Sequence, residues 1–251
     1  MRSCLRISPH PTPIGSRPRP RTGFLCFNDE LLIVEDRRMR DDWFRRKTWT
    51  AKDREDFFAR LQRSRGVLHK VQYARIQAYE LLTTRTPKAY SAALELLDLI
   101  LADWREDAQL ASVYHHRAEC FAGLGDVPRA LDAYRQVFRT QRTRKGELTM
   151  AHLDFGWLVA TTPLPDCYDE ALGLLNEFTH NGFPVHQYRA GAIRALIFAA
   201  RGQREQARGY AQLALQAAAA RHSGFRYHAK LGLVKSPDEK VYKRLKLLAD
   251  Q

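Results

Sequence analysis

The chain repeats itself at a fixed period. A segment that begins at Arg117 returns 77 residues later, from Arg194, and the matching residues are mainly small or aromatic. The matched pairs are Arg117 with Arg194, Ala118 with Ala195, Phe121 with Phe198, Ala122 with Ala199, Gly125 with Gly202, and Ala130 with Ala207. Because a fixed period indicates one supersecondary unit stacked on copies of itself, the chain is predicted to form one continuous repeat core.

A second, dissimilar unit alternates with the first. Its copies lie 78 residues apart and share a threonine pair, a tyrosine and several alanine and leucine residues. The matched pairs are Thr83 with Thr161, Thr84 with Thr162, Tyr90 with Tyr168, Ala93 with Ala171, Leu94 with Leu172, Leu96 with Leu174, and Leu97 with Leu175. The order is therefore A-B-A-B, and duplication of a two-repeat block is the simplest origin.

The spacing within the B units resembles that of the tetratricopeptide repeat family. The residues that carry the resemblance are Ala118, Phe121, Gly125, Ala130 and Tyr134 in one copy, and Ala195, Phe198, Gly202, Ala207 and Ala211 in the other. The resemblance implies two antiparallel helices in each unit. We expect Gly125 to supply the positive φ that ends the first helix, and Asp126 to cap the second.

The A units depart from this spacing by three extra residues between their two helices. The longer segments are 83–88 and 161–166, and both contain proline. Because proline cannot extend the preceding helix, we expect longer loops there than in the B units.

These features together predict an all-α fold of about ten helices. The resemblance implies a right-handed, tetratricopeptide-like α-solenoid of about four helical hairpins, with a capping helix at each end. We expect the N-terminal cap in residues 39–70, the repeats in residues 71–221 and the C-terminal cap in residues 222–251.

Local signals mark both capping helices. Thr50 with Asp53 resembles a capping box that opens the N-terminal helix. Ser236, followed by a proline, is predicted to cap the last helix. We expect Trp43 and Trp49 to be packing residues of the N-terminal cap.

Residues 1–38 differ from the rest of the chain. Prolines interleaved with arginines prevent a stable helix, and the continuous apolar core of a secretory signal is missing. We favour translation from Met39, which makes this segment a disordered or spurious leader. No apolar run reaches the roughly 18 residues needed to span a bilayer, so we expect a cytoplasmic protein without a membrane partner.

The sequence carries no motif of the common hydrolases, metalloproteases or nucleotide-binding loops, so the chain is predicted not to be an enzyme and to hold no cofactor. No metal site is expected either. His115 and His116 are adjacent, and neighbours on a helix point about 100° apart, so this pair cannot clamp one ion by itself. The four cysteines form no C-x-x-C pair, and Cys120 is expected to be a buried thiol.

The family resemblance implies that the first helix of each unit lines a concave groove. The groove positions carried over to this chain are Gln72, Arg75, Tyr79, Ser112, His115, Glu119, Leu153, Trp157, Arg189 and Leu196. The lysine and asparagine clamp with which some family members hold a C-terminal carboxylate is missing. A mixed aromatic and basic groove suits a peptide or helical segment of another protein, so a non-catalytic adaptor or scaffold is expected.

The charge of the chain leaves a second function open. The chain has 41 Lys and Arg against 28 Asp and Glu, a formal net charge of +13. Arg201, Arg204 and Arg208 recur at helical spacing, and one basic stripe of this kind is typical of a surface for nucleic acid or another polyanion. Ordinary charged decoration of solvated helix faces is the simpler explanation of the arginines. A degenerate enzyme or an enzyme-associated subunit is the third alternative.

Deletion of residues 1–38 is expected to leave the melting temperature nearly unchanged, because a loose segment loses conformational entropy if it is ordered. Thermal unfolding of the full chain and of the chain from Met39 measures this. A drop of more than a few degrees in the shorter protein would show that the leader packs on the repeats.

Overall fold

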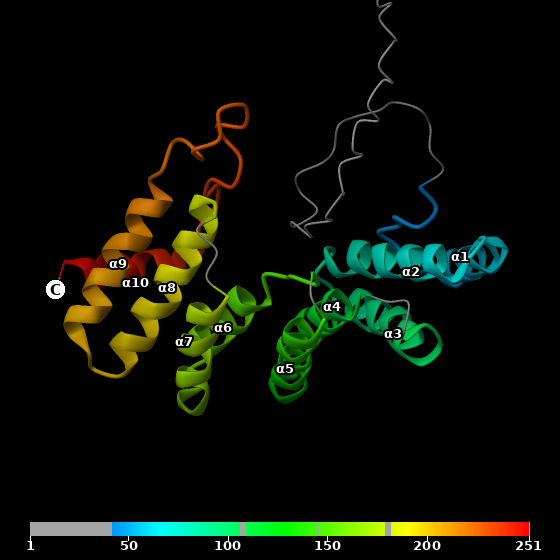
Figure 1. Cartoon of the computed structure of the whole chain (residues 1–251), viewed down its shortest axis with the longest axis horizontal. Coiled ribbons are helices and arrows are strands. Elements are labelled where there is room, and N and C mark those ends of the chain that lie inside the picture. Colours follow the sequence, from blue (N-terminus) through cyan, green and yellow to red (C-terminus); the bar gives the residue numbers. More distant parts are fainter. Residues whose placement is uncertain (1–41, 106–108, 145, 179–181, 251) are drawn as a thin grey trace, which may run out of the picture.

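The computed structural model describes residues 42–105, 109–144, 146–178 and 182–250. Within these ranges the protein contains ten α-helices, one short 3-10 helix and no strand, which confirms the all-α prediction (Figure 1). The predicted leader, residues 1–38, lies outside the described residues. None of the helices in the described ranges combines the length and the apolar character needed to cross a membrane.

The helices follow one another with short connections. Their bounds are α1 (Ala51–Arg63), α2 (Val67–Leu82), α3 (Pro87–Asp103), α4 (Leu110–Gly123), α5 (Val127–Thr143), α6 (Ala151–Thr161), η3 (Pro165–Cys167), α7 (Tyr168–Glu177), α8 (Pro184–Ala200), α9 (Arg204–Ala218) and α10 (Glu239–Ala249).

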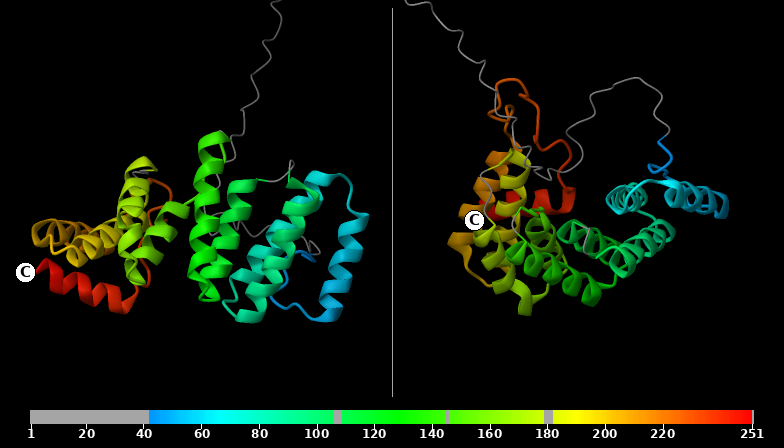
Figure 2. Two further views of the ribbon diagram at one scale, coloured as in Figure 1. Left: turned by 90° about the horizontal axis from the view of Figure 1, so that it is seen from below. Right: turned by 45° about the vertical axis from the view of Figure 1, so that its right-hand side comes forward.

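Consecutive helices pack as hairpins. α2 packs against α3, α4 against α5, α6 against α7, and α8 against α9. The four hairpins succeed one another along the long axis of the molecule, as Figures 1 and 2 show. The helices predicted to belong to one unit are therefore neighbours in space.

The two helices of each hairpin contact the next hairpin differently. The first helices pack in succession, α2 on α4, α4 on α6, and α6 on α8. Long side chains join the second helices α5 and α7, through ion pairs of Arg135 with Glu170 at 2.7 Å and of Arg142 with Glu177 at 2.6 Å. A surface hollow of about 370 Å³ lies between these two helices. The first helices thus contact one another in a row, while α5 and α7 are bridged by long side chains across a hollow.

The turns follow the local prediction. Gly125 and Gly202, which are equivalent in the two B units, have φ of 77° and 73°. Residues other than glycine adopt this conformation only with strain. Asp126 caps α5, because its Oδ1 accepts a hydrogen bond from the backbone N–H of Arg129 at 3.1 Å. The A units have longer connections than the B units, as predicted, and the second contains the helix η3.

The segment before α1 is fixed to α2 by one buried amide. Gln77 is fully buried, and its side chain accepts a hydrogen bond from the backbone N–H of Arg46 at 2.9 Å and donates one to the Arg46 carbonyl at 2.8 Å. The capping box of Thr50 and Asp53 is present at the start of α1. It holds the pKa of Asp53 at about 2, chiefly through the hydrogen bond from the Thr50 backbone.

Both tryptophans before α1 pack as predicted. Trp43 contacts Phe57 and Tyr73, with ring centroids 5.3 and 5.1 Å apart, and Trp49 contacts Phe57 at 5.4 Å. Because Phe57 is fully buried, these rings extend the core of the first hairpin over α1.

The C-terminal helix completes a second, smaller core. Val241, Leu245 and Leu248 of α10 are buried against α8 and α9. The prediction that Ser236 caps this helix is wrong, because α10 begins at Glu239 and the Asp238 side chain accepts the hydrogen bond from the backbone N–H of Val241 at 2.9 Å. Asp238 directly precedes Glu239, the first residue of α10, so it occupies the N-cap position.

Ala118 lies in α4 with no exposed surface, at the place where the small residues of the repeat pattern meet. We expect Ala118→Leu to lower the free energy of unfolding by about 1–3 kcal/mol or more, because a larger side chain at a closely packed position forces the helices apart. Urea denaturation measures this change. Ala59→Leu, on the exposed side of α1, is the control and should be tolerated. Equal stability of the two variants would contradict the assigned repeat register.

Candidate functional site

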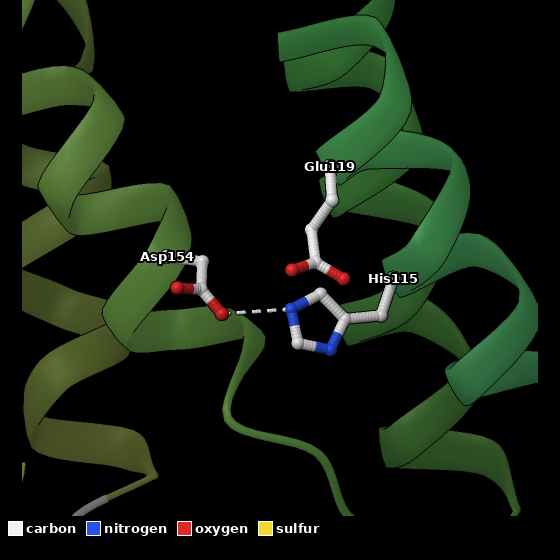
Figure 3. Close-up of side chains that lie close together, drawn as sticks. All are labelled: His115, Glu119 and Asp154. Atoms are coloured by element: carbon white, nitrogen blue, oxygen red, sulfur yellow. Dashed lines mark hydrogen bonds and ion pairs between the residues drawn. The ribbon is translucent and has the colours of Figure 1, made fainter. Parts of the chain in front are cut away.

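Three ionisable side chains meet between α4 and α6. His115 and Glu119 are four residues apart on α4 and therefore lie on one face of the helix. Asp154 faces them from α6, and its Oδ2 is 2.8 Å from Nε2 of His115 (Figure 3). One nitrogen or oxygen atom from each of the three residues lies within 4.8 Å of the corresponding atoms of the other two. Two neighbouring first helices thus build one compact polar cluster.

A fourth charged residue joins the cluster from the next first helix. Arg189, on α8, places Nη1 2.7 Å from Oδ1 of Asp154. Its guanidinium also lies over the ring of Trp157, 5.3 Å from the centroid. Trp157 in turn packs against both apolar cores. The cluster therefore links α4, α6 and α8.

Enclosure of these groups shifts their proton affinities. Burial acts to lower the pKa of His115, but the carboxylates of Glu119 and Asp154 outweigh it and leave this pKa raised. Burial raises the pKa of Glu119 to about 7. Burial acts in the same direction on Asp154, but Arg189 and His115 together hold its pKa below the ordinary value. Asp154 is therefore ionised near neutral pH, while Glu119 exchanges its proton there.

The carboxylate of Glu119 lacks a hydrogen-bond donor within the part of the chain that the structure describes. Asp154, in contrast, has partners for both of its oxygens. Glu119 is half-buried, so its carboxylate has lost part of its contact with water without gaining a protein donor. Glu119 is thus the member of the cluster that is available to a ligand.

A second group of predicted groove residues lies beside this cluster. The ring of Tyr79 is 5.3 Å from that of His116, and His116 is buried with no hydrogen bond to its Nδ1. Burial, with Arg75 and His115 nearby, lowers the pKa of His116 well below its ordinary value, so this ring is neutral. Arg75 itself is half-buried and, among the described residues, belongs to no ion pair.

The remaining groove predictions fall in different environments. Gln72 is exposed on α2. Ser112 and Leu153 are 7% and 3% exposed, so their side chains are packed inside the protein. Leu196 is half-buried against the C-terminal core. Of the ten predicted positions, the structure thus brings His115, Glu119, Trp157 and Arg189 into one cluster.

The three arginines of the predicted basic stripe are not equivalent. Arg201 forms an ion pair with Asp169 at 2.9 Å, and its guanidinium lies over the Tyr168 ring. Arg204 and Arg208 are exposed, and neither has an ionic partner in the described ranges. The exposed Asp169 therefore offsets part of the positive charge at Arg201, whereas Arg204 and Arg208 on α9 have no such partner among the described residues.

Asp154 was not among the predicted groove residues. Its sequence signal was its position as the one acidic residue of α6, a helix that is otherwise apolar apart from a histidine and a threonine. A charged side chain at such a position indicates a buried partner, because an unpaired charge is expensive to bury. The identity of that partner depends on how the hairpins stack.

Comparisons with known proteins returned no match: neither a protein-family model, nor a curated protein, nor a solved structure resembles the chain significantly. The tetratricopeptide resemblance therefore depends on the repeat residues alone.

We expect Arg189→Ala to lower the free energy of unfolding by about 1–3 kcal/mol, because it leaves the enclosed Asp154 carboxylate without its cation. Arg204→Ala, which removes an exposed and unpaired arginine, is the matched control and should be nearly neutral. Urea denaturation of both variants, of Asp154→Ala, and of Arg189→Ala combined with Asp154→Ala gives the coupling between Arg189 and Asp154. Strict additivity in this cycle would show that the ion pair contributes nothing.

Proposed function

We propose that the chain is a non-catalytic, tetratricopeptide-like scaffold that binds a peptide or helical segment of a partner protein on its first helices. The observation that carries the proposal is the unequal packing of the two helices in each hairpin. The first helices α2, α4, α6 and α8 contact one another in succession, whereas α5 and α7 are joined by ion pairs between long side chains. A stack that is tighter on one side curves toward that side, so the first helices line a concave face.

The arrangement of the helices in space is consistent with such curvature. In the right-hand view of Figure 2 the helices follow an arc from α1 to α10. The residues predicted for the groove come from the first helices, and several of them carry aromatic or charged groups. Extended or helical segments of other proteins are commonly bound on surfaces of this shape.

The chemistry of the proposed surface suits a protein partner. Arg75, Tyr79 and Trp157 belong to the residue types in which interface energy is concentrated. Arg75 belongs to no ion pair among the described residues, so it is available to a carboxylate of the partner. Trp157 is one of the predicted groove residues. Because it also packs against both cores, its truncation would test the fold and the interface together, and Arg75 is the better residue to change.

The alternative function, binding of nucleic acid or another polyanion, is supported by the formal net charge of +13 and by the exposed Arg204 and Arg208. The ion pair of Arg201 with Asp169 weakens this support, because it removes one of the three arginines from the stripe.

Site-specific photocrosslinking distinguishes the two functions. A photoreactive amino acid at Gln72, which is exposed on α2, is expected to capture one protein partner in host cells. The same group at Arg208, exposed on α9, is the matched control and should capture little. Nucleic acid attached through position 208, with nothing attached through position 72, would replace the scaffold proposal with the polyanion alternative.

Once the partner has been identified, Arg75→Ala is expected to weaken its binding roughly thirtyfold, about 2 kcal/mol, as for a central interface arginine. The pair Arg204→Glu and Arg208→Glu should change the affinity little. Isothermal titration at two salt concentrations measures both effects. A silent Arg75→Ala, together with loss of binding in the charge-reversed pair and a steep salt dependence, would favour the polyanion function.

A further inference from the structure

We propose that His115, Glu119 and Asp154 form a binding site for one divalent first-row transition-metal ion, with Zn²⁺ as the ion to test. This inference goes beyond the proposed scaffold function and does not depend on it.

The geometry of the three side chains suits one ion. Each residue offers one ligand atom, and these atoms lie within 4.8 Å of one another. Zinc binds nitrogen and oxygen ligands at about 2.0–2.2 Å, so neighbouring ligand atoms of a tetrahedral site are roughly 3.4 Å apart. On binding, the ligand atoms of His115 and Asp154, now 2.8 Å apart, must separate and the Glu119 carboxylate must move toward them. Figure 3 shows the three groups facing one another across the gap between α4 and α6.

The hydrogen bond between His115 and Asp154 marks the position of the ion. A single proton lies between Nε2 of His115 and Oδ2 of Asp154, which are 2.8 Å apart. Both atoms are metal ligands once that proton is released. An ion that binds there takes the place of the proton and draws in the carboxylate of Glu119.

Arg189 acts as an outer-shell residue of this site. Its Nη1 binds Oδ1 of Asp154 at 2.7 Å, so that Oδ2 is left turned toward His115. Metal-binding carboxylates are commonly held in this manner by a second hydrogen bond, which fixes their orientation. The ion pair therefore prepares Asp154 as a ligand without occupying the oxygen that the metal needs.

Glu119 supplies the independent observation. Glu119 is half-buried, its carboxylate lies beside His115 and Asp154, and no group in the described ranges donates a hydrogen bond to it. Coordination of a cation gives this carboxylate the partner that the protein does not supply.

The ligand set selects the class of ion. One imidazole and two carboxylates suit zinc and its first-row neighbours, whereas calcium requires six to eight oxygen ligands. Three protein ligands also leave a fourth position for water or another ligand. Of the adjacent histidines His115 and His116, only His115 belongs to the proposed site.

The test uses the purified full chain, treated with a chelator and measured without any partner. Isothermal titration with ZnCl₂ should give one equivalent bound per chain, and CoCl₂ should give the visible absorption of a tetrahedral Co²⁺ site. Glu119→Gln keeps the shape of the side chain but removes its charge, and His115→Ala removes the nitrogen ligand. Each is expected to weaken Zn²⁺ binding about tenfold or more.

Two control variants address binding elsewhere. Glu55→Gln changes an exposed glutamate of α1, and His222→Ala with His228→Ala removes two exposed histidines of the loop before α10. Both should bind Zn²⁺ as the parent does. Circular dichroism checks that each variant is folded, and if His115→Ala unfolds, Glu119→Gln decides the question.

The proposal is overturned if the folded parent binds no Zn²⁺, if folded Glu119→Gln binds it unchanged, or if the loop variant abolishes binding. Because no partner is present in these measurements, their failure leaves the scaffold proposal untouched. Failure of the crosslinking experiment equally leaves the metal site untouched.

Discussion

The structure depends on close approach between the two helices of each hairpin. Ala118 and Ala130 have no exposed surface, and their equivalents Ala195 and Ala207 are buried in the same way. In the last hairpin, a Cβ added to Gly191 would lie 3.2 Å from the backbone of Ala214. Small residues at these positions let the helix backbones come together, and larger ones would separate them. The small residues that repeat in the sequence therefore mark the positions at which the two helices of a hairpin approach each other.

This packing decides which distant residues meet. Because the first helices contact one another in succession, side chains on the same side of α4, α6 and α8 become neighbours. His115, Asp154 and Arg189 are 39 and 35 residues apart in sequence, about one hairpin in each case, and they form a continuous chain of polar contacts. In a stacked fold of this kind, residues about one hairpin apart in sequence thus become neighbours and can form a site.

The polar cluster is expensive to maintain in such a core. Burying charges costs free energy that paired partners only partly offset, and apolar residues of similar size are often more stabilising. Asp154 stands in a helix that is otherwise mostly apolar, and Glu119 lacks a hydrogen-bond donor among the described residues. Perturbed ionisable groups of this kind cluster at functional sites. A ligand bound at Glu119, whether a metal ion or a group of a partner, would offset the free-energy cost of keeping these charged groups in the protein.

The sequence by itself determined the helical fold, the turns at Gly125 and Gly202 and the caps at Thr50 and Asp126, because each of these depends on residues within one or two helical turns. It did not determine the cap of α10, because Ser236 and Asp238 are both suitable cap residues and only the start of the helix at Glu239 gives the role to Asp238. Only the tertiary structure decided that Asp154 completes the cluster, that Arg189 covers Trp157 and that Asp169 pairs with Arg201. These contacts join different hairpins, and their partners are fixed by the register in which the hairpins stack, which no local pattern records.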